Sequence, residues 1–442
     1  MLTAALILCL LNDTVVLTSE HFRLTSEVEE SDALREIIAD LESLWTEASG
    51  LFGQSPSGEE LIDVHLYATV ASYQAAELEL TEGRFATNLA FSHFGTKSSH
   101  VALQPPVSEA VIARLGVPKQ TRKLLVHEAS HAFAYRLFPN HRSHPSWFAE
   151  GFSIWLAAKT GIARGWMSST ESDPNSSTRA TTGQKLLASD RMPGLEQLML
   201  GKLEGLSSRE SYACYDLFFG FLMESLSKKK VALLLGEVRR LGGGGNFAER
   251  VKDVVVDVAG DPLKLDRKFH KFVESLKPEW DQLYRSLRVS DDGWVQSAFT
   301  DTNAIAWRRE KPRKSKYTVR GSVEILPGKR TQLNFLIDRR EAGPKRGFIS
   351  LAFAAETGLT LFEYLPDSKG WVNLAFAKVE TIVAGQQIEF EIKVSGDELR
   401  VSVDGESAIR VIVTDRDMGG PWGLGAQSGT TGIWKLEKAP GL

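Results

Sequence analysis

The order of apolar and polar residues divides the 442-residue chain into two parts. In residues 15–289, short apolar runs alternate with segments in which apolar side chains recur every three or four positions, which is the period of a helix. In residues 290–442, apolar and polar residues alternate over short runs that turn signals separate. The pattern predicts a multidomain chain, with an α+β domain over 15–289 and an all-β sandwich over 290–442.

Two helices are predicted in the middle of the first domain. Apolar residues recur at helical spacing from Lys119 to Phe138, and Pro118 and Pro139 stand at the two boundaries. The second helix is expected from about Ser146 to Lys159. Its apolar side chains are so numerous that this helix should be mostly buried.

Shorter elements are predicted around these two helices. Ser31 is expected to cap a long amphipathic helix that reaches at least Trp45, and a strand is expected from Leu61 to Tyr67. The stretch Phe85 to Gln104 is predicted to contain an edge strand. Met167 to Gly183 is rich in Ser and Thr and is predicted to be a loop that borders the cleft of this domain. Gly242 to Gly245 lacks the Lys-Ser/Thr of a phosphate loop and is predicted to be a flexible turn.

In the second part, turns such as Pro327-Gly328 and Asp404-Gly405 bound the alternating runs. The predicted strands are Tyr317–Ile325, Gln332–Asp338, Phe348–Phe353, Leu359–Tyr364, Gln387–Val394, Leu399–Val403 and Ile409–Val413.

Composition narrows the possible functions. Hydrophobic residues make up 43% of the chain, which is enough for sizeable cores, and the net charge of −4 argues against a dedicated nucleic-acid binder. Cys9 and Cys214 are too few for a disulfide framework. No segment approaches the length of an integral membrane span, so none is expected.

The first residues are almost entirely apolar from Met1 to Leu11. This run is too short to cross a bilayer and suits the apolar region of a signal peptide over 1–14, although no basic segment precedes it and no Ala-x-Ala follows it. A buried first strand is the alternative. We favour export, and therefore a secreted or cell-envelope protein of bacterial type.

The candidate chemistry lies on the two central helices. His127 and His131 are four residues apart, so they share one helix face and can bind one metal ion together. Glu128 lies between them, turned towards a metal-bound water. Glu150 is the one acidic residue in the second helix, where a carboxylate among apolar side chains needs a partner such as a metal. The set predicts a Zn2+ site with one position left for water.

Two simpler interpretations remain open for these residues. In the first, the segment is a core helix with two hydrogen-bonded histidines and a surface glutamate. In the second, zinc is bound but only as a structural ion, although structural sites usually use four protein ligands, mostly cysteine.

The arrangement His127-Glu128-Ala129-Ser130-His131 with Glu150 after 18 intervening residues resembles the gluzincin metallopeptidases, as does Trp147 to Gly151. The resemblance implies a thermolysin-like domain in which His127, His131 and Glu150 bind zinc and Glu128 is the general base. Ala134 and Leu137 stand where a metzincin has glycine and histidine. The Gly-x-Met-Glu-Asn motif of aminopeptidases is absent, which favours an endopeptidase.

Related gluzincins use a tyrosine or histidine from a later helix to stabilise the developing oxyanion. Tyr212, near the start of an apolar helix, is the candidate by this resemblance, and Tyr215 is the second. In the simpler interpretation, either tyrosine only packs at the edge of the core. His141 and His144, in the loop between the ligand helices, are weaker candidates for the mouth of the cleft, and loop histidines are usually solvated.

The segment Ile392 to Gly405, with Gly423-Leu424-Gly425, resembles concanavalin A-like and laminin-G-like jelly rolls. Many such sandwiches bind glycans. Tryptophans at four positions are candidates for stacking on sugar rings, although buried sandwich tryptophans are commoner: Trp307, Trp371, Trp422 and Trp434.

Two functions follow from the sequence. The first is a zinc endopeptidase that hydrolyses peptide bonds of a peptide or protein substrate, with an accessory sandwich that targets it or binds glycan or protein. The second is a non-catalytic binding protein in which the sandwich recognises glycan or protein and the peptidase-like domain is a scaffold.

Overall fold

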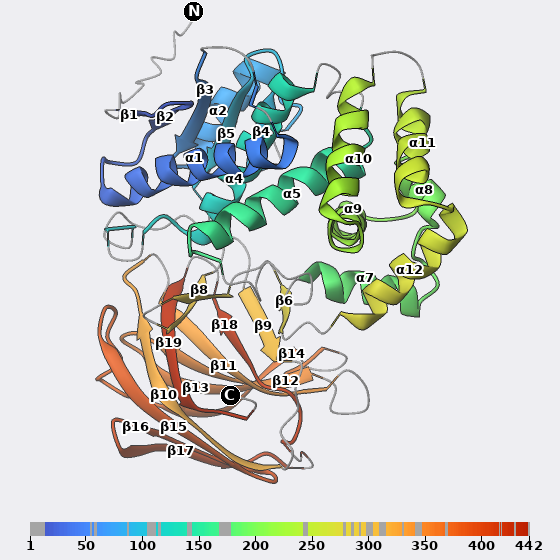
Figure 1. Cartoon of the computed structure of the whole chain (residues 1–442). Helices are drawn as coiled ribbons and strands as arrows, with labels where there is room; N and C mark the ends of the chain where they lie inside the picture. Colours follow the sequence, from blue (N-terminus) through green and yellow to red (C-terminus); the bar gives the residue numbers. More distant parts are fainter. Residues whose placement is uncertain are drawn as a thin grey trace, which may run out of the picture.

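The structure is a computed structural model (Figure 1). It describes the chain outside residues 1–13, 54, 57–59, 86–87, 104–111, 114–115, 139–143, 168–177, 242–245, 277–279, 284–286, 291–292, 298–303, 309–314, 329–330, 341–346, 367–369, 415, 417, 428–429 and 441–442. The predicted signal peptide and the four-glycine turn lie outside the described residues and stay predictions.

A five-stranded sheet begins the chain, with the strand order β1-β2-β3-β5-β4. The three central strands are parallel, and the strand at each edge is antiparallel to its neighbour. Helices α1 and α4 pack on one face and α2 on the other, so the sheet forms the middle of three layers (Figure 1). The strands are β1 Val15–Thr18, β2 Phe22–Ser26, β3 Ile62–Tyr67, β4 Ala90–His93 and β5 Ser98–Ala102, with α1 at Asp32–Phe52, α2 at Val70–Thr81 and α4 at Lys119–Leu137.

A group of helices follows the sheet. Helix α5 lies against α4 on one side and α9 on the other, and its apolar residues are buried as predicted. The later helices begin at clear N-caps, since the hydroxyl of Ser207 and the carboxylate of Asp261 accept backbone N–H bonds. These helices are α5 Ser146–Ala163, α7 Thr178–Ala188, α8 Leu195–Met199, α9 Ser208–Ser225, α10 Lys228–Arg240, α11 Phe247–Ala259 and α12 Pro262–Ser275.

The close contact between α5 and α9 depends on Gly151. A Cβ atom at this position would lie 2.5 Å from Cβ of Phe219 and 2.9 Å from the backbone oxygen of Tyr215. These separations are too short for non-bonded atoms. The absence of a side chain at residue 151 is therefore what lets α9 lie directly against the first turns of α5.

The carboxylate of Asp40 on α1 is buried at the junction of the central helices. The guanidinium group of Arg122 on α4 donates two bonds of 2.7 Å to it. Arg164, the residue after α5, donates a third bond of 3.1 Å, and the indole of Trp166 donates a fourth of 3.0 Å. Asp40 thus links α1 to both of the central helices.

Two seven-stranded sheets form the second part of the molecule, below the helices in Figure 1. Their inner faces enclose one apolar core, which confirms the predicted β-sandwich and the coarse α+β, multi-sheet character of the chain. One sheet contains β17 Glu406–Ile412, β16 Glu398–Val403, β15 Gln387–Ser395, β10 Lys316–Ile325, β19 Thr431–Lys438, β8 Gly293–Ser297 and β7 Leu287–Ser290. The other contains β14 Gly370–Ala377, β13 Gly358–Leu365, β12 Gly347–Ala354, β11 Gln332–Arg340, β18 Gly423–Ala426, β9 Ala304–Arg308 and β6 Trp280–Leu283.

Several elements differ from the sequence prediction. The predicted loop Met167 to Gly183 is wrong in its last part, since α7 already begins at Thr178. Strand β14 was not predicted, because its sequence does not alternate strictly. Strands β6 and β7 begin before residue 290 yet belong to the two sheets of the sandwich. Ser31 stands at the start of α1, but its hydroxyl forms no cap hydrogen bond.

Among the described residues, no helix has both the length and the apolar character that a membrane span requires.

The sandwich contains a buried ion cluster. The guanidinium group of Arg416 donates a 2.7 Å bond to the carboxylate of Asp338 and a 3.0 Å bond to that of Glu363. The third guanidinium nitrogen donates a 2.6 Å bond to the backbone oxygen of Asp338. One cation thus bonds to two carboxylates that come from different strands, and Arg340 also bonds to Asp338, at 2.9 Å.

Replacing Arg416 with leucine should lower the free energy of unfolding of the sandwich by about 3–5 kcal/mol, because the buried cluster loses the guanidinium group that bonds to both of its carboxylates. The measurement is urea denaturation followed by tryptophan fluorescence. Arg410→Leu is the control, since Arg410 pairs with Glu398 at the surface and should cost under about 1 kcal/mol. Equal losses in the two variants would contradict a structural role of the buried cluster.

Candidate metal centre

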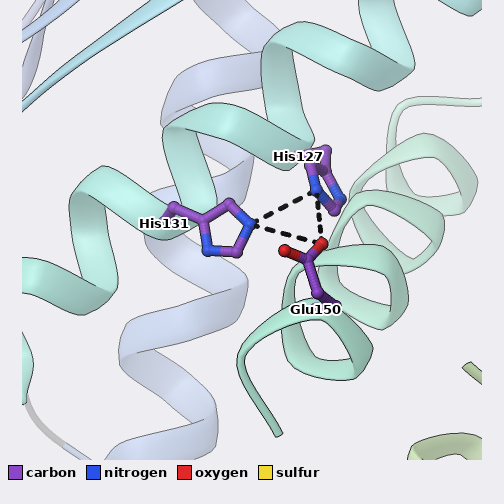
Figure 2. Close-up of side chains that lie close together, drawn as sticks. All are labelled: His127, His131 and Glu150. Carbon is purple, nitrogen blue, oxygen red and sulfur yellow. Dashed lines mark hydrogen bonds and ion pairs between the residues drawn. The ribbon is translucent and has the colours of Figure 1, made fainter. Parts of the chain in front are cut away.

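Three predicted ligands come together between α4 and α5. His127 and His131 project from successive turns of α4, and Glu150 projects from the first turn of α5 towards both rings (Figure 2). Oε2 of Glu150 lies 3.3 Å from Nε2 of His127 and 3.7 Å from Nε2 of His131. The two imidazole Nε2 atoms are 3.3 Å apart. The three atoms surround a point at which one small cation fits.

The surroundings of Glu150 agree with a metal ligand. Its Oε2 atom is buried and has no hydrogen bond of good geometry, so its nearest partners are the two ring nitrogens. Burial alone would raise the pKa of Glu150, but the charges and bonds of His131 and His127 hold it well below its usual value. Burial alone would lower the pKa of His131. The charge of Glu150 and its bond to the ring have the larger effect, so the pKa of His131 is raised. The carboxylate is therefore ionised and ready to bind a cation.

Two imidazoles and one carboxylate are the ligand types of catalytic zinc sites, which leave a fourth position for water or substrate. In the described part of the chain, this is the one group of three such side chains close enough to share an ion. Cys214 is buried in the core of α9 and takes no part in this group. The residues thus fit the predicted Zn2+, and His127, His131 and Glu150 would bind it.

Glu128 is a neighbour of the ligand group rather than a member of it. Its Oε1 atom lies 4.0 Å from Nε2 of His127, and the residue is buried. The hydroxyl of Ser92, on the edge strand β4, lies 2.9 Å from Oε2 and 2.7 Å from the backbone oxygen of Glu128. One carboxylate oxygen of Glu128 is therefore held by a hydroxyl while the other faces the ligands.

No motif or spacing in the sequence distinguishes Ser92. It lies in the stretch predicted to contain an edge strand, but one serine among several there carries no distinguishing spacing. Its role appears only when β4 is placed beside α4, because the contact joins residues 36 positions apart.

Both candidate tyrosines lie near the group, on α9. Tyr212 is 40% exposed, and its partial burial, followed by the charges of Glu150 and Glu128, raises the pKa of its phenol. Tyr215 is buried, and of these two carboxylates only Glu150 affects its pKa. Tyr212 is therefore the tyrosine that is both accessible and close to the two acids, and its hydroxyl stays protonated at neutral pH.

Arg179 adds a positive charge near Tyr212, and no motif in the sequence distinguishes this residue. Nη1 of Arg179, in the first turn of α7, lies 2.9 Å from Oδ2 of Asp216 on α9. The charge of Arg179 lowers the pKa of Tyr212, against the effect of burial and the carboxylates. The residue lies within the segment that the sequence predicted as a loop beside the cleft.

The remaining histidines lie outside the ligand group. His144 is buried against Phe138, Phe148 and Phe247, and burial lowers its pKa to about 4. It is therefore a packed, neutral side chain rather than a group at the mouth of a cleft. His141 lies outside the described residues.

No protein-family model matches the chain, and no curated protein matches it. Three similar solved structures are a carbohydrate-binding module, CBM66, from Bacillus subtilis, the exoplasmic/lumenal domain of VIP36 in its Ca2+/Man-bound form, and the carbohydrate recognition domain of Emp47p. Their identities are 14%, 15% and 14%, and their TM-scores are 0.30, 0.28 and 0.27. They cover 35%, 37% and 36% of this chain and 91%, 85% and 88% of their own.

Two of the three are described as carbohydrate-binding or carbohydrate-recognition domains, and the third is described with Ca2+ and Man bound. At such identities and TM-scores, the likenesses decide neither the family nor the ligand of this chain.

The purified protein is expected to retain zinc after dialysis. His131→Ala and Glu150→Ala should each weaken zinc binding by at least about 100-fold, which exceeds the 10–100-fold loss typical of a supporting residue. The measurement is metal content by mass spectrometry together with titration by a competing chelator. His93→Ala is the control, because His93 bonds to Thr96 and lies outside the ligand group. Unchanged zinc affinity in both ligand variants would contradict the site.

Proposed function

We propose that the chain is a zinc-dependent metallopeptidase, most simply an endopeptidase. The observation that supports this proposal is the convergence of His127, His131 and Glu150 with Glu128 beside them and not among them. A structural zinc site needs no such additional carboxylate, whereas hydrolysis needs a base next to the metal. The resemblance of the same residues to gluzincins supports the same chemistry.

When bound, zinc would lower the pKa of its water to about 7 and polarise the scissile carbonyl. Glu128 takes a proton from the attacking water and passes it to the leaving nitrogen, so that the peptide yields a carboxylate and an amine. The protonated phenol of Tyr212 donates a hydrogen bond to the carbonyl oxygen as negative charge develops there.

Ser92 and the strand around it support this chemistry. The hydroxyl of Ser92 fixes one oxygen of Glu128 and so limits the orientations of the base. Strand β4 is the last strand of its sheet, so one edge of its backbone has no neighbouring strand among the described residues. An extended peptide can add to such an edge through main-chain hydrogen bonds. This mode of binding would bring a peptide alongside Ser92 and Glu128.

The second candidate function is a binding protein whose sandwich recognises glycan or protein. The observation in its favour is a pair of solvent-exposed aromatic residues on the sandwich, Trp371 and Phe376. The two candidates are compatible if the sandwich directs a peptidase to its substrate. If the metal site proves to be inactive, only the binding function remains.

Glu128→Gln should abolish cleavage of a denatured protein such as casein, with kcat/KM falling at least about 100-fold, because general-base catalysis contributes 10²–10⁴-fold. Zinc content should stay unchanged, since Glu128 is not a ligand in this arrangement. The control is Glu47→Gln, the same substitution at an exposed position of α1. Cleavage by Glu128→Gln at the wild-type rate would contradict the peptidase proposal.

Ser92→Ala should lower kcat by about 3–10-fold, the effect of roughly 1 kcal/mol from one lost hydrogen bond. Zinc affinity should not change, and Ser92→Thr should restore most of the activity because it keeps the hydroxyl. Loss of zinc from Ser92→Ala would show instead that the residue supports the fold of the site.

A further inference from the structure

The outer face of β12, β13 and β14 carries a group of aromatic side chains. Residues paired across neighbouring strands point to the same side of a sheet. In these strands the inner positions, such as Leu351 and Leu361, belong to the core between the sheets. The outer positions are Phe348, Ser350 and Ala352 on β12, Thr360, Phe362 and Tyr364 on β13, and Trp371, Asn373 and Phe376 on β14. We call these nine residues the outer aromatic face.

The rings of this face form one cluster. The ring centroid of Trp371 lies 4.8 Å from that of Tyr364, 5.7 Å from that of Phe348 and 5.9 Å from that of Phe362. Phe348 in turn lies 5.3 Å from Trp307 on β9. The rings therefore fix one another's orientation, and Trp371 is held in place although it is 53% exposed.

A register shift in β14 places a second exposed ring on the same side. Phe376 is five residues after Trp371, an odd interval that would normally put the two side chains on opposite faces. The pairing with β13 shifts between Leu361 and Phe362, which adds one residue to β14 and turns Phe376 back to the outer face. Phe376 is 59% exposed. Their partners on β13, Tyr364 and Thr360, are four positions apart, so the two accessible rings lie roughly 13 Å apart along the sheet, at about 3.3 Å per residue.

The polar residues of the outer aromatic face are all uncharged. Asn373 lies between the two exposed rings, and Thr360 pairs with Phe376 across the strands. None of the nine residues is an aspartate, glutamate, histidine, lysine or arginine. Sheets usually expose charged side chains at their solvent faces, and the opposite sheet does so with ion pairs such as Arg320–Glu391. The outer aromatic face differs from the opposite sheet in this respect, and the nearest cation to its ring cluster among the described contacts is Arg339, over Trp307.

We propose that the outer aromatic face binds a chain of neutral sugar residues. A pyranose ring presents C–H groups on its faces and hydroxyl groups around its rim. Exposed aromatic rings can stack against the C–H groups, and the amide of Asn373 and the hydroxyl of Thr360 can form hydrogen bonds with the hydroxyl groups. Two rings on one strand suit an extended polymer rather than a single sugar. The absence of charge disfavours an ionic polysaccharide.

This inference deepens the second candidate function, since it names a ligand class and a location for the sandwich. It is independent of the metal centre, because no residue of the outer aromatic face belongs to that site. Binding can therefore be measured whether or not the protein cleaves peptides.

The experiment is affinity electrophoresis and calorimetry of the full chain with soluble glucans, mannans and xylans, and with a polyuronate as the charged comparison. At least one neutral polysaccharide should bind. Trp371→Ala and Phe376→Ala should each weaken that binding by about 10-fold or more, as the loss of an aromatic contact residue commonly does. Ile412→Ala is the matched control, because Ile412 is an exposed apolar residue of the other sheet and should leave binding unchanged.

The proposal is overturned if none of the neutral polysaccharides binds, if Trp371→Ala binds as tightly as wild type, or if the polyuronate binds better than the neutral chains. It is also overturned if the wild type forms a dimer that Trp371→Ala disrupts while neither binds sugar, because a second copy of the chain would then cover the face. Glu128→Gln should bind the polysaccharide as wild type does. Failure of the peptidase and failure of sugar binding thus give different results.

Discussion

The buried carboxylate of Asp40 is the interaction on which the placement of the metal centre depends. It accepts bonds from Arg122 in α4 and from Arg164 immediately after α5, so a residue of α1 holds both helices that carry the ligands. A hydrogen-bonded carboxylate at such a junction costs less than an isolated buried charge, because every bond it makes is to a donor that also needs a partner. The separation of His127 from Glu150 is set by these distant contacts as much as by the residues between them.

The two parts of the molecule use buried charge in a similar way and exposed side chains in different ways. In the first part, Asp40 joins helices; in the second, Arg416 joins strands through Asp338 and Glu363. The candidate metal centre lies between two packed helices, which hold its three candidate ligands close together. The outer aromatic face lies on an accessible side of a sheet, where a long flexible ligand can make several contacts in succession.

The candidate ligand group could be predicted from the sequence because the signals that mark it lie close together along the chain. Residues i and i+4 of one helix share a face, and the second helix was marked by its proline boundary and apolar content. The two-layer character of the sandwich was visible for the same reason, since strict alternation marks Gln387 to Val394 and its neighbours. Which family the first domain belongs to, and whether it cleaves peptides, are still predictions.

Other features depended on tertiary contacts that no local pattern contains. Ser92 meets Glu128 only across the sheet-to-helix packing. Four tryptophans were equivalent candidates for sugar binding in the sequence, yet Trp422 and Trp434 are fully buried and Trp307 nearly so. Trp371 is exposed because it lies on an edge strand, and that strand escaped prediction because its extra residue breaks the alternation.

The adjacency of Glu150 and Gly151 has a consequence for how damage to this protein would be recognised. Glu150 is needed for its carboxylate. Gly151 is needed because it has no side chain, since α9 occupies the space that a Cβ atom would fill. A methyl group at residue 151 would push α5 away from α9 and carry Glu150 with it. A substitution that disturbs only the helix packing would then be observed as a loss of metal binding at the candidate site, although none of the three ligand residues had been changed.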